Sequence, residues 1–190
     1  MSLRWKEHSV LDLLDPGPPL TAAGERLVVA ASELFYRHGI RAVGVDLIAE
    51  SAGTTKKTLY DRFGSKDALV ALYLRRRART WQAFLAEHTR GDGSVLAVFD
   101  ALDAWLDHQD RGCAFVNAYA EIGGTDHPGV AVVRAEKEWM RELFVGLVGD
   151  ARLGAQVHLL YEGATVMVTA GGQPDAVVRA REAARSLLEV

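Results

Sequence analysis

Cysteine is nearly absent from this chain of 190 residues, which contains only Cys113. One cysteine cannot form an internal disulfide or a cysteine-rich zinc site. Long apolar runs are also absent, since stretches such as residues 27–31 and 164–170 fall short of the ~20 residues that a membrane span requires. The N-terminus lacks the continuous apolar core of a secretory signal. We therefore expect a cytoplasmic protein with no membrane role.

The alternation of apolar and polar residues that marks β-strands is absent too, so the sequence predicts an all-α fold. Residues 1–20 end in a Pro- and Gly-rich stretch, Asp15 to Pro19, and are expected to form a flexible arm. About nine helices are predicted in the remainder. Their approximate ranges are 21–38, 45–52, 56–63, 65–89, 94–110, 113–122, 128–148, 151–170 and 174–188.

Basic residues are fewer than acidic ones, 22 against 25, which gives a net charge of −3. A negative net charge is unusual for a nucleic-acid-binding protein. The charge is unevenly distributed, however. Residues 21–80 hold 11 Lys/Arg against 6 Asp/Glu, or +5, whereas residues 81–190 hold 9 against 16, or −7. This asymmetry indicates that one end of the chain faces phosphate and the other does not.

Two short predicted helices, 45–52 and 56–63, flank Gly53, and this arrangement is typical of a helix-turn-helix. Glycine allows the sharp turn at this position. Ile48, Ala49 and Ala52 are small or apolar, so we expect them to pack against Leu59 and Phe63. The side chains left on the open side of the second helix are Lys56, Lys57, Thr58 and Tyr60. A short helix with such a polar face suits the major groove of DNA, which is about 12 Å wide.

The segment from Gly39 to Leu69 resembles the DNA-binding region of TetR-family transcriptional regulators, and the resemblance extends back through Ala30–Phe35. It implies a three-helix DNA-binding head with the helix-turn-helix at residues 21–66, followed by a larger helical effector-binding and dimerisation domain at 67–190. It also implies a repressor that binds a palindromic operator as a homodimer and is released by a small molecule. One departure is Arg62, where the family often has histidine.

The resemblance also assigns roles to single residues. Thr55, Lys57, Tyr60 and Lys66 are expected to hold phosphates of double-stranded DNA, and Thr54 to join them from the turn. Lys56, Thr58 and either Arg41 or Val45 are candidates for contacts with base edges. The run Arg75–Arg79 is compatible with DNA contact, with a solvated helix face or with acidic partners in the chain.

A single head reads only a few base pairs, so useful affinity requires two heads about one groove repeat (~34 Å) apart. The last two helices combine small residues, which permit close approach, with apolar ones. The predicted dimer interface consists of Gly154, Val157, Leu160, Tyr161, Ala164, Val168 and Leu187.

The middle of the chain is rich in aromatic residues, and in the family this region encloses a small-molecule site. An apolar or aromatic effector is expected there, although each aromatic side chain taken alone is more often plain core. The candidate effector-binding residues are Trp81, Phe84, Trp105, Phe115, Asn117, Tyr119 and Trp139.

The sequence leaves two alternative functions open. An enzyme would use histidine–carboxylate groups such as His108 with Asp103 and Asp107, His127 after Asp126, or His158 with Glu162. The sequence has no His-Glu-x-x-His helix, no Gly-x-Ser-x-Gly elbow and no phosphate-binding glycine loop, so no catalytic residue, cofactor or metal is predicted. The second alternative is a helical sensor or adaptor that has lost DNA binding.

Overall fold

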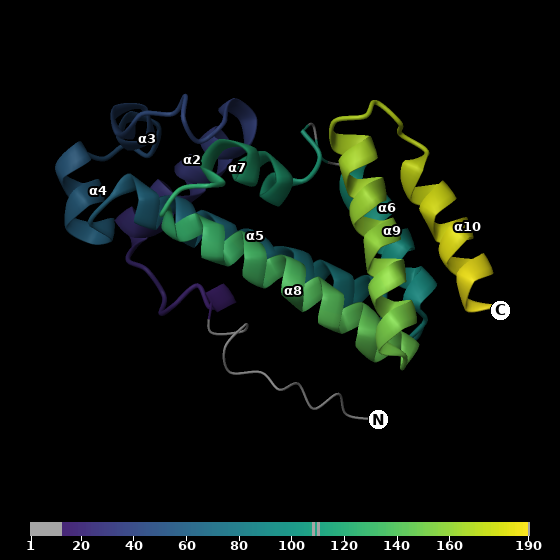
Figure 1. The fold of residues 1–190 in the computed structure, drawn as a ribbon. Helices are drawn as coiled ribbons and strands as arrows, with labels where there is room; N and C mark the ends of the chain where they lie inside the picture. Colours follow the sequence, from purple (N-terminus) through teal and green to yellow (C-terminus); the bar gives the residue numbers. More distant parts are fainter. Residues whose placement is uncertain (1–12, 108, 110, 190) are drawn as a thin grey trace. The chain divides into compact units, whose positions relative to one another are not determined.

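The computed structural model describes residues 13–107, 109 and 111–189. These residues form helices and loops without a β-strand, as the sequence predicts (Figure 1). The helices are α2 (Ala22–His38), α3 (Val45–Ser51), α4 (Lys56–Phe63), α5 (Lys66–His88), α6 (Val95–Leu106), α7 (Ala114–Ile122), α8 (Pro128–Val148), α9 (Ala151–Thr169) and α10 (Ala176–Leu188). The described helices number nine and match the predicted ranges to within a few residues. None of them is long and apolar enough to cross a membrane.

The helices pack into two compact units. Among the described residues, the head unit comprises 13–79 and 114–135, and the body unit comprises 80–113 and 136–189. The head unit therefore contains α7 and the first part of α5 as well as α2, α3 and α4, although the sequence assigned α7 and α5 to the second domain. Burial explains this grouping, because Leu69, Val70 and Leu74 of α5 are completely buried and complete the core that short helices cannot build alone.

Local signals set the boundaries of α2. The hydroxyl of Thr21 accepts a hydrogen bond from the Gly24 backbone N–H, and Glu25 lies in the first turn, where a negative charge is favourable. The helix ends at Gly39, whose φ of 90° is rarely adopted by other residues and whose N–H donates to the Phe35 carbonyl. Its buried face is lined by Leu27, Val28, Ala31 and Phe35.

Two contacts hold α5 to the N-terminal part of the head unit. The guanidinium of Arg76 donates to both carboxylate oxygens of Glu25 on α2, at 2.5 and 2.8 Å. Arg75 donates to the Leu13 carbonyl at 3.1 Å, and Leu14 is completely buried. The end of the predicted flexible arm is thus packed onto the head, because Leu14 gains an apolar contact that composition alone did not indicate. The other predicted arm residues, 1–12, lie outside the described part of the chain.

The body unit is built around one apolar core. Phe99 from α6, Phe144 from α8 and Tyr161 from α9 lie within 5.3 to 6.1 Å of one another, measured between ring centroids. α10 runs beside α9 and also packs against α6 (Figure 1). Gly154 permits the close approach of α9 to α8, since a Cβ there would lie 2.5 Å from the Val145 Cα. The core of this unit thus depends on helices from two separate parts of the sequence, α6 on one side and α8 to α10 on the other.

Candidate nucleic-acid interface

The helix-turn-helix comprises α3, the turn at Gly53 and α4. Gly53 has a φ of 58°, which confirms the need for glycine in the turn. Ile48, Ala49, Ala52 and Leu59 are buried between the helices, as predicted, and Phe63 is half-buried. The turn is further held by Arg26 of α2, whose Nε donates to the Ala52 carbonyl at 3.1 Å.

The N-terminus of α4 is capped by Thr55. Its Oγ1 accepts a hydrogen bond from the Thr58 backbone N–H at 3.1 Å and lies 2.9 Å from the Thr58 hydroxyl. Thr55 therefore caps α4, a structural role in addition to the phosphate contact expected from the sequence. The hydroxyl of Thr54 is buried and makes no hydrogen bond within the described residues.

The basic and aromatic side chains predicted to meet DNA lie mainly on the outside of α4. Tyr60 is 43% exposed. Lys57 forms an exposed ion pair with Asp61 at 2.6 Å, and Lys56 forms one with Asp46 of α3 at 3.2 Å. Exposed ion pairs of this kind contribute little to stability, so both ammonium groups can exchange their partners for phosphate at small cost.

The three remaining candidates differ in exposure. Arg41 is exposed and Val45 is half-buried. The side chain of Lys66 points inward, because its Nζ donates to the Ile40 carbonyl at 2.6 Å and lies 5.9 Å from the centre of the Phe35 ring. Desolvation lowers the pKa of Lys66, against the opposing effect of Asp67 and Glu121. In this structure Lys66 therefore holds the loop before α3.

Three arginines of the run Arg75–Arg79 contact other residues of the head unit. Arg75 bonds to Leu13, Arg76 bonds to Glu25, and the guanidinium of Arg77 lies 5.1 Å from the centre of the Tyr36 ring. Of the three alternatives left open by the sequence, an acidic partner in the chain describes Arg76 alone, because Arg75 contacts a backbone carbonyl and Arg77 an aromatic ring.

The candidate effector residues fall into both units. In the body, Trp81, Phe84 and Trp105 contact one another, with ring centroids 4.9 to 6.0 Å apart. The indole N–H of Trp81 donates to the sulfur of Met140, and Trp139 is half-buried. In the head, Phe115 is buried, Tyr119 is exposed, and Asn117 lines a cavity of about 10 Å³, room for about one water molecule.

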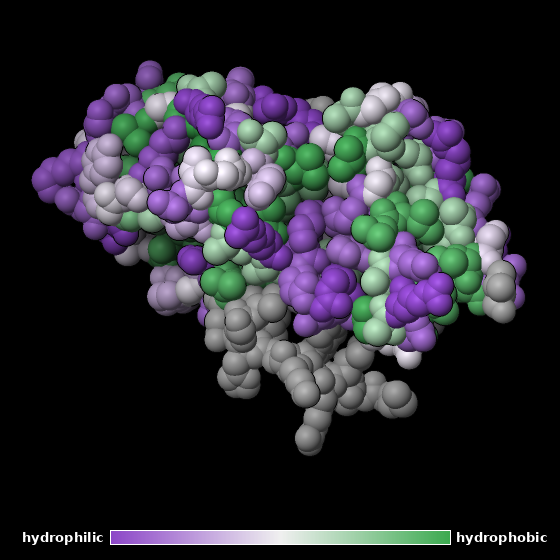
Figure 2. Space-filling model, in the orientation of Figure 1, coloured by the Kyte–Doolittle hydropathy of each residue, from purple (hydrophilic) through white to green (hydrophobic). Residues whose placement is uncertain are grey.

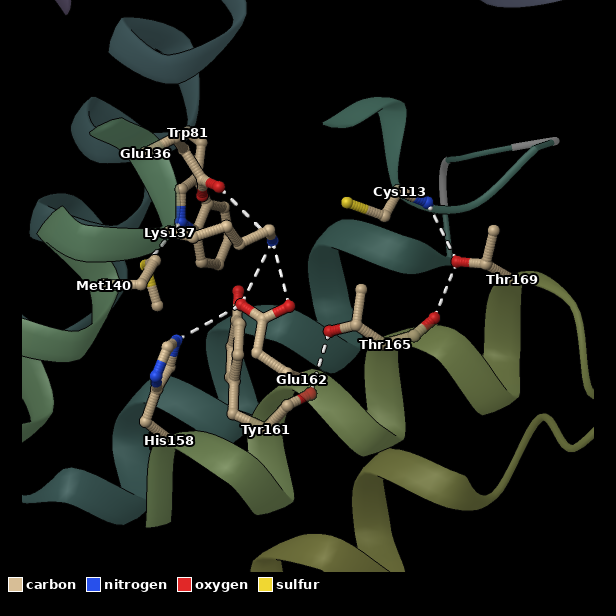
Figure 3. A network of polar contacts seen from close by, with 10 residues as sticks. All are labelled: Trp81, Cys113, Glu136, Lys137, Met140, His158, Tyr161, Glu162, Thr165 and Thr169. Carbon is tan, nitrogen blue, oxygen red and sulfur yellow. Dashed lines mark hydrogen bonds and ion pairs between the residues drawn. The ribbon is translucent and has the colours of Figure 1, made fainter. Parts of the chain in front are cut away.

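A partly buried charge network lies in the body unit (Figure 3). The ammonium of Lys137 lies 3.2 Å from the Glu136 carboxylate and 3.0 Å from that of Glu162, and His158 Nε2 lies 3.3 Å from Glu162. Burial raises the pKa of Glu136. Burial also opposes ionisation of Glu162, but hydrogen bonds from His158 and Lys137 lower its pKa overall. The sequence indicated only the pairing of His158 with Glu162, because Glu136 and Lys137 lie on another helix. His108, named in the enzyme alternative, lies outside the described residues.

The predicted dimer residues are distributed over the body unit. Gly154, Val157, Tyr161 and Ala164 are buried in the core of the single chain, whereas Leu160, Val168 and Leu187 are half-buried. The exposed face of α9 instead presents Leu159, which is 70% exposed, and Val166. Val178 is exposed on α10.

Comparisons with known proteins agree with this architecture. Residues 27–73, which cover most of α2, α3, α4 and the start of α5, match the model of bacterial regulatory proteins of the tetR family. The chain is 32% identical over 140 residues to the HTH-type transcriptional activator FasR of Mycolicibacterium smegmatis, covering 74% of this chain and 54% of FasR. It is 35% identical over 80 residues to the HTH-type transcriptional repressor BdcR of Escherichia coli, covering 42% of this chain and 41% of BdcR. The chain thus spans about half or less of these curated relatives.

Among solved structures, the chain is similar to SCO4454, a TetR-family transcriptional regulator from Streptomyces coelicolor. The TM-score is 0.79 at 27% identity, and the match covers 88% of this chain and 95% of SCO4454. This similarity extends beyond the helix-turn-helix and includes both units. The family indicated by the segment Gly39–Leu69 is confirmed, and the chain belongs to the TetR family of bacterial regulatory proteins.

Proposed function

We propose that this chain is a transcriptional regulator that binds double-stranded DNA through α4, acts as a homodimer on a palindromic site, and is released by a small-molecule effector. The observation that supports DNA binding most directly is the division of α4 into two faces. Leu59 is completely buried, whereas Lys56, Lys57 and Tyr60 are exposed. An eight-residue helix is about 12 Å long and fits the major groove.

Dimerisation is proposed through the exposed face of α9 and α10. Figure 2 shows hydrophobic side chains gathered over these two helices, and the exposed ones include Leu159, Val166 and Val178. Leu159 and Val166 are seven residues, or two helical turns, apart and lie on one side of α9. A second copy of the chain is the occupant that the mechanism requires, because two heads about one groove repeat apart are needed for useful affinity.

The effector is proposed to bind against the aromatic cluster of Trp81, Phe84 and Trp105, and to have apolar or aromatic character. A ligand that favours one conformation of the protein shifts the population away from the DNA-binding one. The three candidates on α7 (Phe115, Asn117 and Tyr119) belong to the head unit and are kept as an alternative effector site. A drug-sized ligand occupies several hundred Å³, far more than the cavity of about 10 Å³ beside Asn117, so an effector at this alternative site requires rearrangement of α7.

Repression is the mode of regulation that the resemblance implies, and we keep it as part of the proposal. The named relatives include both an activator, FasR, and a repressor, BdcR. The same head serves either mode, since the position of the operator relative to the promoter determines the outcome. In vitro transcription from a template that carries the selected site will distinguish the two.

The proposed DNA binding is tested by selection from random duplex DNA, followed by affinity measurements at several salt concentrations. We expect a palindromic winner with steep salt dependence, and weaker binding with a shallower slope for Lys57→Ala/Tyr60→Ala. The matched control is Arg90→Ala, which removes an exposed basic side chain from the turn after α5, away from α4, α9 and α10. Selection of no sequence, with equally weak binding by wild type and the double variant, would contradict the proposal and support the sensor or adaptor alternative.

A further inference from the structure

The loop between α2 and α3, residues 39–44, is held by a carboxylate from a distant part of the chain. Glu121 of α7 accepts a hydrogen bond from the Ile40 N–H through Oε1 at 2.9 Å, and from the Arg41 N–H through Oε2 at 2.7 Å. One carboxylate thus satisfies two successive backbone donors that are about eighty positions away in sequence. Hydrogen bonds to a charged acceptor are stronger than neutral ones.

Lys66 holds the same loop through a backbone carbonyl, whereas Glu121 binds its N–H groups. The Lys66 Nζ donates to the Ile40 carbonyl at 2.6 Å, and Ile40 itself is buried. The electrostatic effect of Glu121 favours the charged form of Lys66. The peptide unit around Ile40 is therefore bound by an anion at its N–H groups and by a cation at its carbonyl.

Gly39 shows how closely the carboxylate approaches the loop. A Cβ at this position would lie 2.8 Å from Glu121 Oε1, and the φ of 90° also disfavours other residues. The loop leads directly into α3, whose N-cap residue, Gly44, provides no side-chain cap. The loop therefore lacks its own side-chain anchor at the start of α3.

We propose that Glu121 is a positioning residue for DNA binding, which fixes the loop that sets Arg41 and the start of α3. This inference rests on the proposed function and adds to it a residue outside the helix-turn-helix. Glu121 does not contact DNA in this mechanism. It acts by holding the backbone from which Arg41 and Val45 project.

The sign of the effect of Glu121→Gln on affinity separates positioning from general electrostatics. Removing a negative charge from a DNA-binding unit reduces repulsion from phosphate, so it tightens binding if nothing else changes. Loss of one of the two hydrogen bonds from Glu121 to the loop weakens DNA binding instead. The amide of glutamine has only one oxygen that can accept, and its NH₂ group faces the second backbone N–H. We expect roughly tenfold weaker binding to the selected site at fixed salt, the equivalent of about one charged hydrogen bond.

The experiment compares wild type, Glu121→Gln and Glu121→Asp with Asp126→Asn, an exposed carboxylate of the same unit. Both Glu121 variants should bind more weakly, Glu121→Asp because its shorter side chain cannot span the two N–H groups, and Asp126→Asn should bind equally or more tightly. Amide hydrogen exchange is the second readout. The Ile40 and Arg41 amides should exchange faster in the Glu121 variants, whereas the Ala52 amide, bonded to Ile48, should not change.

Equal or tighter binding by Glu121→Gln than by wild type overturns the inference and leaves the proposed function intact. Failure of wild type itself to bind any selected DNA overturns both. Unfolding of Glu121→Gln is detected by circular dichroism, and in that case Glu121→Asp, which retains the charge, decides: wild-type affinity and wild-type exchange at Ile40 and Arg41 would overturn the inference.

Discussion

Two neighbouring threonines in the turn between α3 and α4, Thr54 and Thr55, differ in their hydrogen bonding although they are the same residue type. Thr54 and Thr55 are adjacent, yet Thr55 caps α4 through the Thr58 N–H and Thr54 keeps a buried hydroxyl without a partner. A cap satisfies a backbone donor that an isolated helix end leaves open, whereas an unpartnered buried hydroxyl only adds a desolvation cost. The two threonines should therefore respond in opposite ways to loss of the hydroxyl.

We predict that Thr55→Val lowers the free energy of unfolding by about 1 kcal/mol, because the cap of α4 is lost. Thr54→Val is the matched control and should leave stability unchanged or raise it slightly. Urea unfolding of the two variants beside wild type measures the difference. Equal destabilisation by both would show that the cap does not explain the role of Thr55.

Charged residues of α8 should give the body unit two opposing dependences on pH. Burial raises the pKa of Glu136, so the folded chain holds this proton to higher pH than the unfolded chain. Its stability contribution is present below the ordinary value of 4.5 and is lost as pH rises through the raised pKa. Glu138 behaves in the reverse way, since a hydrogen bond from Arg141 lowers its pKa, and its contribution is lost as pH falls through that lowered value.

We predict that the stability of wild type relative to Glu136→Gln decreases as pH rises above 4.5. The stability of wild type relative to Glu138→Gln should decrease as pH falls below 4.5. Urea unfolding at a series of pH values measures both slopes. The same sign of slope for the two variants would contradict the assignment of Glu136 as the buried carboxyl with the raised pKa.

At the scale of helices, α2 carries two Glu–Arg pairs of different construction. Glu25 pairs with Arg76 of α5 through two hydrogen bonds, whereas Glu33 pairs with Arg37 one turn away on the same helix at 3.3 Å. The Glu25–Arg76 pair joins α2 to α5 through two parallel hydrogen bonds. The Glu33–Arg37 pair lies on the exposed face of α2 and joins no second element. Bidentate pairs between arginine and a carboxylate are stronger and geometrically better defined than single contacts.

We predict a coupling energy of roughly 1 kcal/mol between Glu25 and Arg76, since both side chains are partly exposed and solvent screens the pair. For Glu33 and Arg37 the coupling should be ~0.3–0.5 kcal/mol. Double-mutant cycles built from Glu→Gln and Arg→Met substitutions provide the measurement. A larger coupling for the pair within α2 would refute this ranking.

At the scale of the whole molecule, the proposed dimer depends on apolar surface that a single chain leaves exposed. We predict that Leu159→Lys dissociates the dimer, because it places a charge at the centre of the exposed α9 face. Val29→Lys is the matched control, since Val29 is 63% exposed on α2 in the head unit. Sedimentation velocity should show monomers for Leu159→Lys and dimers for wild type and Val29→Lys. A monomeric wild-type protein would exclude this interface.

The sequence alone determined the helices and the identity of the head. Helical spacing, the N-cap residue Thr21, and the glycines at 39 and 53 are local signals, so they predict elements without knowledge of the fold. The helix-turn-helix is predictable for the same reason, because Ile48, Ala49 and Leu59 are close in sequence and their packing follows from a short motif.

Helix packing, in contrast, determines which apolar face of α9 is internal. Both faces carry apolar side chains, and their spacing favours neither, so the sequence predicts Val157 and Tyr161 at an interface, whereas the core of the single chain covers them. The same holds for the roles of Lys66 and Glu121, which meet the loop at Ile40 from positions 26 and 81 residues away. Contacts over such separations depend on how helices pack, and no local pattern in the sequence records that packing.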